Sequence, residues 1–457
     1  MAKEPSMSIA LIILAAGKGT RMKSDLPKVL HEIGGAPMLV HAVQAGRTLD
    51  PDRTVVVAGH GADAVAAAMR DHDDTVRIVL QEDQLGTAHA VAQARPELAG
   101  FEGDALVLYG DTPFIRPETL RRMAEARRAH DIVVLGFEAA DPGRYGRLVV
   151  ENGALTRIVE FNDATPTEQA ITLCNSGVVM APAPVLFDLI DAVGNDNAAG
   201  EYYLTDIVGL ARARGLSATA VTCAESETMG INSRTELSVA EAAFQARRRA
   251  EAMENGVTLI APDTVHFAHD TYLGRDCLIE PNVIFGPGVT IETGARIRAF
   301  SHLEGCHVAR GAVVGPYARL RHGSELAEDV RIGNFVEVKQ ALIGEGTKIN
   351  HLSYIGDAEI GRDSNIGAGT ITCNYDGVMK HATRIGDRVF IGSDTMLVAP
   401  VSVGDDAMTG SGSVITRDVA PGALAIGRAR QVEKPGFARK LLDMLRAKKA
   451  QRDKERK

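Results

Sequence analysis

The second half of the chain repeats an aliphatic residue every six positions, and this period constrains the fold more than any other feature. A helix repeats at 3.6 residues and an ordinary strand at two. A prism-shaped coil repeats at six, because each flat face uses one short strand and one tight corner, with the aliphatic side chain inward. The positions are Leu273, Ile279, Phe285, Ile291, Ile297, Leu303, Val308, Val314, Leu320, Leu326, Ile332, Val338, Ile343, Ile349, Ile355, Ile360, Ile366, Ile385, Ile391, Leu397, Val403, Thr409 and Ile415.

The hexad series slips by one residue at three places and is interrupted by an insertion at residues 372–384. We expect these irregularities to break the prism, and a break in a regular solenoid is where a functional site is expected. The pattern resembles the left-handed parallel β-helix of hexapeptide-repeat acyltransferases. The handedness is implied by that resemblance and not by the spacing.

The first half alternates short apolar runs with helical patterns. Buried strands that alternate with helices predict a mostly parallel sheet covered on both faces, a Rossmann-like α/β domain. Asn152-Gly153, between two alternating runs, predicts a β-hairpin. The expected strands are 9–15, 55–58, 77–80 and 105–109, and the expected helices are 37–49, 86–94 and 117–130.

A polar helix rich in alanine and arginine is expected from Glu236 to Glu254, ended by Asn255-Gly256. We interpret it as a connector between the halves. The predicted domains are therefore residues 1–235, a connector at 236–256, and a β-helix with a C-terminal arm at 257–457.

Composition narrows the class of protein. The net charge of -9 argues against nucleic acid as a partner. Five scattered cysteines without CxxC spacing indicate a reduced, cytoplasmic location with neither a zinc site nor a disulfide framework. The apolar stretch at residues 9–16 is too short to span a membrane, and a signal peptide is the alternative interpretation.

The segment "LAAGKGTRM" (14–22) follows the first predicted strand, so it lies at the carboxyl end of the sheet, where ligands bind. It is not GxxxxGK[ST], because one residue separates Gly17 from Gly19. Its glycines let backbone N–H groups approach phosphate oxygens. Arg21 and Lys28 add cations that would neutralise a leaving pyrophosphate. A plain basic turn is the alternative.

Three further stretches point to a nucleotide site. "YGDTP" (109–113) places Asp111 at a strand end, where its carboxylate can reach Mg²⁺, and Asn232 in "GINSR" is a candidate second oxygen ligand. The two glutamines of "QEDQLGTAHA" (81–90), Gln81 and Gln84, offer amides suited to a nucleobase edge. The alternatives are a turn-capping Asp and solvated glutamines.

His351 stands in "NHLSY", beside the middle slips of the hexad series. The resemblance to hexapeptide-repeat acyltransferases implies acyl transfer; an amine that attacks a thioester needs a base, and histidine titrates near working pH. Glu337 is a candidate to orient the imidazole, while Arg321 and Lys339 suit a sugar phosphate. A solvated turn histidine is the alternative. Further polar residues of this stretch are Tyr354, Asn365, Asn374 and Tyr375.

The chain resembles, over nearly its whole length, the bacterial bifunctional N-acetylglucosamine-1-phosphate uridyltransferase/glucosamine-1-phosphate acetyltransferases. The resemblance rests on motifs that occur in the family's order. The first alone would indicate only a sugar nucleotidyltransferase, whereas the last ties the β-helix to this enzyme. They are "LAAGKGTRM", "LPKVLH", "QLGTAHA", "YGD", "NFVEVK", "GDAEIG" and "NIGAGTITCNYDG".

The resemblance implies an enzyme that makes UDP-N-acetylglucosamine for cell-wall and lipopolysaccharide synthesis from glucosamine-1-phosphate, acetyl-CoA and UTP, with Mg²⁺. It implies nucleotide and sugar contacts from Leu14, Ala15, Ala16, Gly17, Gln81, Gly86, Thr87, Tyr109, Gly110, Gly146, Glu160 and Asn175, with Arg21 and Lys28 on the phosphates and Asp111 and Asn232 on the metal. It implies glucosamine phosphate contacts from Arg321, Lys339, Tyr354 and Asn365, with His351 and Glu337 in catalysis. It implies acetyl-CoA contacts from Ala368, Asn374, Tyr375, Ser393, Ser411 and Arg428.

The resemblance also implies a homotrimer with acetyl-transfer sites between neighbours, and neither a nucleic-acid nor a membrane partner. Ser411 and Ser233 depart from the family pattern, which leads us to expect alanine and asparagine there. The basic tail, 439–457, matches the family's arm only loosely. Two alternatives stay open: a nucleotidyltransferase for another sugar with a purely structural β-helix, and a non-enzymatic interaction protein on the same plan.

Overall fold

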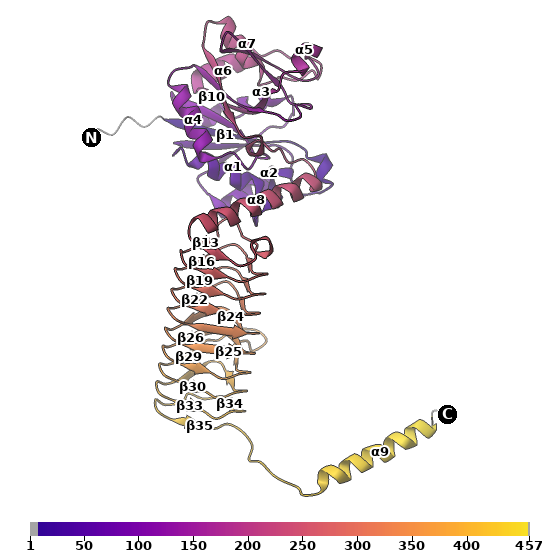
Figure 1. Ribbon diagram of the computed structural model, residues 1–457, viewed down its shortest axis with the longest axis vertical. Coiled ribbons are helices and arrows are strands. Elements are labelled where there is room, and N and C mark those ends of the chain that lie inside the picture. Colours follow the sequence, from indigo (N-terminus) through magenta and orange to yellow (C-terminus); the bar gives the residue numbers. More distant parts are fainter. Residues whose placement is uncertain (1–7, 456–457) are drawn as a thin grey trace, which may run out of the picture. The chain divides into compact units, whose positions relative to one another are not determined.

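The computed structural model describes residues 8–455, and its chain forms two compact units (Figure 1). The first unit runs to Ala250 and also includes Phe267–His269. The second comprises Glu251–His266 and the chain from Asp270 onward. Arg456 and Lys457, counted in the basic tail, lie outside the described residues.

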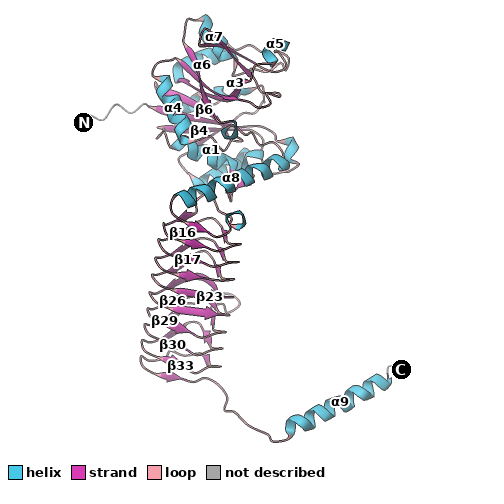
Figure 2. Cartoon of the chain, viewed as in Figure 1, coloured by secondary structure: helices cyan, strands magenta, loops and turns pink. Residues whose placement is uncertain are grey.

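The first unit is built on a mixed sheet of order β11-β7-β10-β6-β1-β4-β5, in which β10 alone runs antiparallel to its neighbours β6 and β7. The strands are β1 (Ile9–Ala15), β4 (Arg53–Ala58), β5 (Arg77–Leu80), β6 (Asp104–Tyr109), β7 (Ile132–Glu138), β10 (Leu173–Pro182) and β11 (Ala218–Cys223). The helices are α1 (Met38–Arg47), α2 (Ala62–His72), α3 (Thr87–Ala92), α4 (Pro117–Arg127), α5 (Pro166–Gln169), α6 (Ala183–Ile190), α7 (Asp206–Ala213) and α8 (Arg234–Glu254) (Figure 2).

Both faces of this sheet are buried, as the alternation of strands and helices predicted. Along β1, Ile12 and Leu14 belong to one apolar core, whereas Leu11 and Ile13 belong to a second. Successive side chains of a strand point to opposite faces. The sheet therefore separates two cores, and the prediction of an α/β fold is confirmed.

Two local predictions are also met. β8 (Arg147–Glu151) and β9 (Ala154–Val159) form the hairpin, with Asn152 and Gly153 both at positive φ. α8 ends at Glu254, and Gly256 follows at positive φ.

The second unit is a β-helix whose strands pair in parallel from coil to coil (Figure 1). One face comprises β12 (Thr258–Leu259), β14 (Leu278–Ile279), β17 (Arg296–Ile297), β20 (Val313–Val314), β23 (Arg331–Asn334), β25 (Lys348–His351), β27 (Asn365–Ile366), β30 (Phe390–Ile391), β33 (Met408–Thr409) and β35 (Leu424–Ala425). The remaining strands are β13 (Tyr272–Leu273), β15 (Ile284–Phe285), β16 (Val289–Ile291), β18 (His302–Leu303), β19 (Cys306–Val308), β21 (Arg319–Leu320), β22 (Ser324–Leu326), β24 (Glu337–Ile343), β26 (Tyr354–Ile360), β28 (Ile371–Cys373), β29 (Thr383–Ile385), β31 (Met396–Val398), β32 (Val401–Val403) and β34 (Val414–Ile415).

The hexad positions are inward-facing as predicted: all of them except Leu273 are buried. The expectation that the slips and the insertion break the prism is wrong. Parallel pairing continues across a shortened coil, because Ile343 stays in register with Ile360. It also continues across the insertion, because Ile360 pairs with Ile385. The extra or missing residues are absorbed in the corners.

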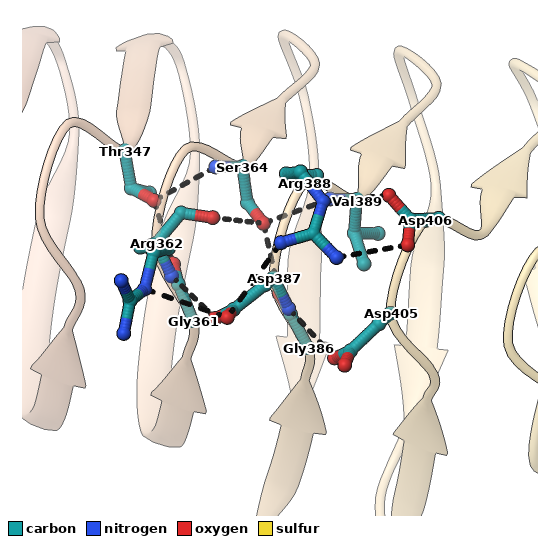
Figure 3. Close-up of polar contacts among 10 residues, drawn as sticks. All are labelled: Thr347, Gly361, Arg362, Ser364, Gly386, Asp387, Arg388, Val389, Asp405 and Asp406. Atoms are coloured by element: carbon teal, nitrogen blue, oxygen red, sulfur yellow. Dashed lines mark hydrogen bonds and ion pairs between the residues drawn. The ribbon is translucent and has the colours of Figure 1, made fainter.

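Polar side chains at the corners bond the backbone of the neighbouring coil (Figure 3). The Asp387 carboxylate accepts the N–H of Arg362 at 2.9 Å, and the Asp405 carboxylate accepts the N–H of Asp387 at 2.9 Å. Arg388 donates two hydrogen bonds, of 2.7 and 2.9 Å, to the two carboxylate oxygens of Asp406. The Asp387 and Asp405 carboxylates thus satisfy corner N–H groups that the strands leave without partners, whereas the Arg388–Asp406 pair joins two side chains.

A second type of corner carries large apolar residues. Phe300, Tyr317, Phe335 and Leu352 occupy left-handed backbone conformations, with φ of 60°, 56°, 56° and 49°. The first three rings stack, with centroids 4.9 and 5.3 Å apart. All four side chains are about half exposed or more. Bulky residues seldom adopt positive φ, so this corner ladder is an unusual feature of the chain.

α9 (Phe437–Glu455) ends the second unit, and its described side chains are all exposed. Within the described part of the chain, none of the helices combines the length and the apolar composition needed to cross a membrane.

Candidate functional sites

A cleft in the first unit opens at the carboxyl ends of β1, β5 and β6, where ligands bind in open α/β sheets. Its volume is about 330 Å³. Most of the residues predicted to hold the nucleotide line it. The lining comprises Leu14, Ala15, Ala16, Gly17, Lys28, Val29, Gln81, Gln84, Gly86, Thr87, Ala90, Tyr109, Asp111 and Glu201.

The floor of the cleft is fixed by hydrogen bonds between its loops. The Gln84 amide donates to the carbonyl oxygen of Ala16. The buried Gln81 amide donates to the Gly86 carbonyl at 3.2 Å. Gly86 has φ of 116°, and a Cβ there would lie 2.6 Å from the carbonyl oxygen of Tyr202, so only glycine fits.

Two predicted metal ligands from distant segments meet at one edge of the cleft. The Ile231 N–H donates to the carbonyl of Asp111 at 3.0 Å, which brings the neighbouring Asn232 beside the Asp111 side chain. The Ser233 hydroxyl accepts the N–H of Glu236 at 3.2 Å and caps the start of α8. Ser233, which departs from the family pattern, therefore helps to hold the neighbouring Asn232 in place at the start of α8.

Lys28 lies between these two side chains. Its ammonium forms an ion pair with the Asp111 carboxylate and donates to the Asn232 amide oxygen at 2.9 Å. Because both oxygens converge on one cation, this pair is arranged to hold positive charge. Within residues 8–455, no three side chains of His, Cys, Asp or Glu are grouped to hold a metal. Mg²⁺ would fit here with two protein oxygens, completed by phosphates and water.

Arg21, the second predicted phosphate cation, is exposed on the 3-10 turn Thr20–Met22 and lies outside the lining of the cleft. Gly110, the remaining nucleotide-sugar candidate, follows β6 and donates its N–H to the carbonyl of Leu14 at 2.9 Å.

The predicted sugar contacts surround Tyr109, which borders both the cleft and a smaller cavity that Asn175 also lines. The Asn175 N–H donates to the carbonyl of Gly146 at 2.8 Å. Glu160 lies beside Gly146, since a Cβ on that glycine would be 3.3 Å from Glu160 Oε1. Tyr109, Gly146, Glu160 and Asn175 are therefore neighbours.

Burial raises the pKa of the Glu160 carboxyl, and the nearby Asp163 and Asp206 raise it further. The Thr205 hydroxyl, which donates to Glu160 Oε1 at 3.1 Å, opposes this shift of the pKa. Burial likewise raises the pKa of Tyr109, with added repulsion from Asp111 and Glu160. Perturbed ionisable groups in a cleft are typical of a functional site.

In the second unit, Asn334 orients the imidazole of His351, a contact that was not predicted from the sequence. His351 Nδ1 lies 3.0 Å from Asn334 Oδ1, and the two residues are in register on β25 and β23. A carbonyl oxygen only accepts, so Nδ1 carries the hydrogen. The lone pair of the exposed His351 is therefore on Nε2, where it can accept a proton.

The expected contact between Glu337 and His351 is not made. Glu337 Oε1 instead accepts from Arg321 Nη1 at 2.9 Å. The register explains the difference, because β24 begins at Glu337 beyond the Phe335 corner and pairs Glu337 with Tyr354. Sequence spacing alone does not show on which side of a corner each side chain stands.

The other predicted sugar-phosphate residues fall on this part of the β-helix. The Tyr354 hydroxyl lies 3.4 Å from the side-chain amide of Asn374, a residue predicted to contact acetyl-CoA, which is buried and donates to the Asp357 carboxylate. The Lys339 ammonium, in hydrogen-bond contact with Lys380, lowers the pKa of Lys380. Two adjacent ammonium groups suit an anionic ligand, and Lys380 is a residue that the sequence analysis did not name. Asn365 lies on β27, next to β25.

The predicted acetyl-CoA residues of the last coils form a column. Ala368, Ser393, Ser411 and Arg428 each follow a glycine on successive coils of one face. The backbone carbonyl of Ser393 accepts the Gly412 N–H at 2.7 Å, and the Arg428 side chain donates to the backbone carbonyl of Ser411. Tyr375 lies in the insertion, where its hydroxyl donates to Gly377 at 2.6 Å.

Two domain families match the chain. The MobA-like NTP transferase domain matches residues 11–181, and the bacterial transferase hexapeptide (six repeats) matches residues 270–305 and 382–417. Fold and site thus define a nucleotidyltransferase fused to a left-handed β-helix transferase of the hexapeptide type.

The relatives are more specific. The chain is 69% identical to the "Bifunctional protein GlmU" of Roseobacter denitrificans, covering 97% of this chain and 99% of the relative. It is 68% identical to the "Bifunctional protein GlmU" of Ruegeria pomeroyi, covering 98% of this chain and 100% of the relative. A solved apo UDP-glucose pyrophosphorylase aligns with 53% of this chain and 100% of its own, at 19% identity and a TM-score of 0.45.

The chain belongs to the GlmU family. It is a bifunctional enzyme, a glucosamine-1-phosphate acetyltransferase and an N-acetylglucosamine-1-phosphate uridyltransferase, with nucleotide and sugar phosphate substrates. The alternatives of a purely structural β-helix and of a non-enzymatic protein are not favoured, because the similarity covers both halves.

Proposed function

We propose that uridyl transfer takes place in the cleft of the first unit, with UTP and N-acetylglucosamine-1-phosphate, and acetyl transfer from acetyl-CoA on the β-helix, in a cytoplasmic homotrimer. The observation that carries the first part is the convergence of Asp111 and Asn232 on one cation at the edge of a cleft lined by the phosphate loop. The boundary between the activities falls at the connector, residues 236–256.

In the uridyl site, the chain mainly positions substrates and stabilises charge. Gln81, Gly86 and Thr87 would hold the uridine, and Tyr109, Gly146, Glu160 and Asn175 the sugar. The phosphate oxygen of the sugar attacks the α-phosphorus of UTP, the bond to the β-phosphate breaks, and pyrophosphate leaves. Asp111 and Asn232 would hold Mg²⁺, which neutralises phosphate charge when bound. Lys28 and Arg21 would contribute cations to the phosphates.

On the β-helix, His351 would act as the general base. The amine of glucosamine-1-phosphate attacks the thioester carbonyl of acetyl-CoA, a C–N bond forms, the C–S bond breaks, and coenzyme A leaves as its thiolate. The proton leaves the amine for His351 Nε2, which the Asn334 contact keeps as an acceptor. Arg321, Lys339, Tyr354 and Asn365 would hold the sugar phosphate, while Glu337 holds Arg321.

A trimer is supported by the corner ladder, residues Phe300, Tyr317, Phe335 and Leu352. These side chains combine exposure with an uncommon backbone conformation. A contiguous exposed apolar patch is typical of a protein interface. The ladder adjoins His351, which precedes Leu352, so a neighbouring chain seated there would approach the acetyl-transfer site.

The test of this division is Asp111→Ala, with each activity measured on its own. We expect loss of uridyl transfer and acetylation close to that of the unmodified chain, because Asp111 supplies the only charged oxygen proposed for the metal. Asp83→Ala, at an exposed carboxylate before the cleft loop, is the control and should leave both rates unchanged. Equal loss of both activities in Asp111→Ala would instead indicate misfolding, and unchanged uridyl transfer would remove Asp111 from the site.

A further inference from the structure

The Lys28 ammonium occupies the position where the proposed metal ligands converge. It contacts the Asp111 carboxylate and lies 2.9 Å from the Asn232 amide oxygen. The Lys28 and Asp111 side chains are only 11% and 20% exposed. A partly buried carboxylate is strongly disfavoured without a positive partner. In the ligand-free chain, Lys28 provides that partner.

Lys28 is also next to the phosphate loop. Its Nζ lies 3.9 Å from the position that a Cβ on Gly17 would take. Among the described residues that line the cleft, Lys28 is the only lysine or arginine. A lysine side chain has a flexible four-carbon stem and a compact charge. It can therefore leave Asp111 for a phosphate on the Gly17 loop without a change in the backbone.

We propose that Lys28 is an internal counter-ion that holds the divalent-cation position until nucleotide and metal arrive, and then moves from Asp111 to the nucleotide phosphates. This inference rests on the proposed uridyl-transfer site. A metal that takes the Asp111 and Asn232 oxygens bound by Lys28 must displace the ammonium, which without nucleotide loses its carboxylate partner and gains no phosphate. With nucleotide present, the displaced ammonium gains a phosphate partner. Metal and nucleotide binding are therefore coupled, and the coupling is reciprocal.

The exchange predicts opposite effects of one substitution on two ligands. Lys28→Met removes the competing cation, so Mn²⁺ alone should bind the full-length chain about tenfold more tightly or better. Unit charges a few ångströms apart near a protein surface interact by more than one tenfold step in affinity. UTP alone, without metal, should bind about tenfold more weakly, because the phosphates lose a cation. A merely structural lysine would weaken both ligands.

The measurement is free Mn²⁺ by electron paramagnetic resonance, and UTP by calorimetry, each ligand added alone. Lys28→Gln serves as a second neutral variant that can still donate to Asp111. Lys18→Met, at an exposed lysine of the same loop, is the matched control and should leave Mn²⁺ affinity unchanged. Equal Mn²⁺ affinity in the unmodified chain, Lys28→Met and Lys28→Gln would overturn the proposal.

A further variant distinguishes failure of the Lys28 proposal from failure of the proposed metal site at Asp111 and Asn232. Asp111→Asn in the Lys28→Met background should abolish the strengthened Mn²⁺ binding. If Mn²⁺ bound Lys28→Met tightly and adding Asp111→Asn left that affinity unchanged, the metal would lie elsewhere, and the proposed site itself would be wrong. Loss of binding in the double variant, with tighter binding in the single one, supports both.

Discussion

Asn334 is predicted to set the rate of acetyl transfer through His351 without taking part in the chemistry. Its amide oxygen accepts from His351 Nδ1 at 3.0 Å and so leaves Nε2 as the proton acceptor. Asn334→Ala removes one hydrogen bond on an exposed imidazole, which then samples both tautomers and several orientations. One such bond contributes about 0.5–1.5 kcal/mol. Since about 1.4 kcal/mol is tenfold in rate, acetylation should fall about two- to tenfold.

His351→Ala should cost far more, about 10²–10⁴ in rate, the usual contribution of a positioned general base. The assay is release of free thiol from acetyl-CoA with glucosamine-1-phosphate, at saturating acetyl-CoA. Uridyl transfer by the same preparation is the internal control, because its residues lie in the other unit. Asn334→Asp keeps an acceptor oxygen and should retain more activity than Asn334→Ala. His302→Ala, at an exposed histidine of β18, should have no effect.

Two outcomes would refute this reasoning. If Asn334→Ala lost as much activity as His351→Ala, Asn334 would hold substrate or the fold and would not merely orient the imidazole. If His351→Ala acetylated at the unmodified rate at neutral pH, His351 would be a turn residue. Acetyl-CoA affinity should change little in either variant, because the column ending at Arg428 is the proposed donor site.

Three further outcomes are expected. Glu160→Gln should raise the melting temperature at pH 8 but not at pH 4, because burial raises the pKa of the Glu160 carboxyl in the folded chain. At low pH this carboxyl is neutral in the folded and the unfolded chain, and it destabilises the fold as the pH rises through the raised pKa. An equal gain at both pH values would contradict this. A chain ending at Glu254 should retain uridyl transfer and lose acetylation. It should melt at a lower temperature than a chain ending at residue 269, because the Gln245 amide donates to the Phe267 carbonyl at 2.7 Å and accepts the Phe267 N–H at 2.8 Å. Equal melting temperatures would show that Phe267 adds no stability. Phe335→Ser should shift the particle mass measured by light scattering from three chains toward one, whereas an unchanged trimer would place the interface elsewhere.

The regular parts of the fold could be predicted because each follows from a local rule. Hexad positions such as Leu303 and Val308 are buried because one side chain per short strand must point inward. Asn152-Gly153 adopts the positive φ that a tight hairpin needs. The corner ladder could not be predicted, since propensity argues against Phe335 at positive φ. Its stacking depends on aromatic residues that meet only when successive coils are aligned.

The functional sites, like the fold, could be predicted from the sequence only in part. The phosphate loop and Asp111 could be placed because strand ends converge at one edge of a parallel sheet. Lys28 was expected on phosphates, and its place between Asp111 and Asn232 depends on three segments far apart in sequence. The Asn334 contact with His351, and the Glu337 contact with Arg321, depend on register between coils. A pattern in one strand does not contain that register.

The most direct test of the account is mass analysis of the products formed from glucosamine-1-phosphate, acetyl-CoA, UTP and Mg²⁺ by the unmodified chain, Asp111→Ala and His351→Ala. We expect UDP-N-acetylglucosamine from the unmodified chain, accumulated N-acetylglucosamine-1-phosphate from Asp111→Ala, and almost unreacted glucosamine-1-phosphate from His351→Ala. UDP-N-acetylglucosamine from all three at equal rates, or loss of both steps in each variant, would contradict two separate sites on one chain.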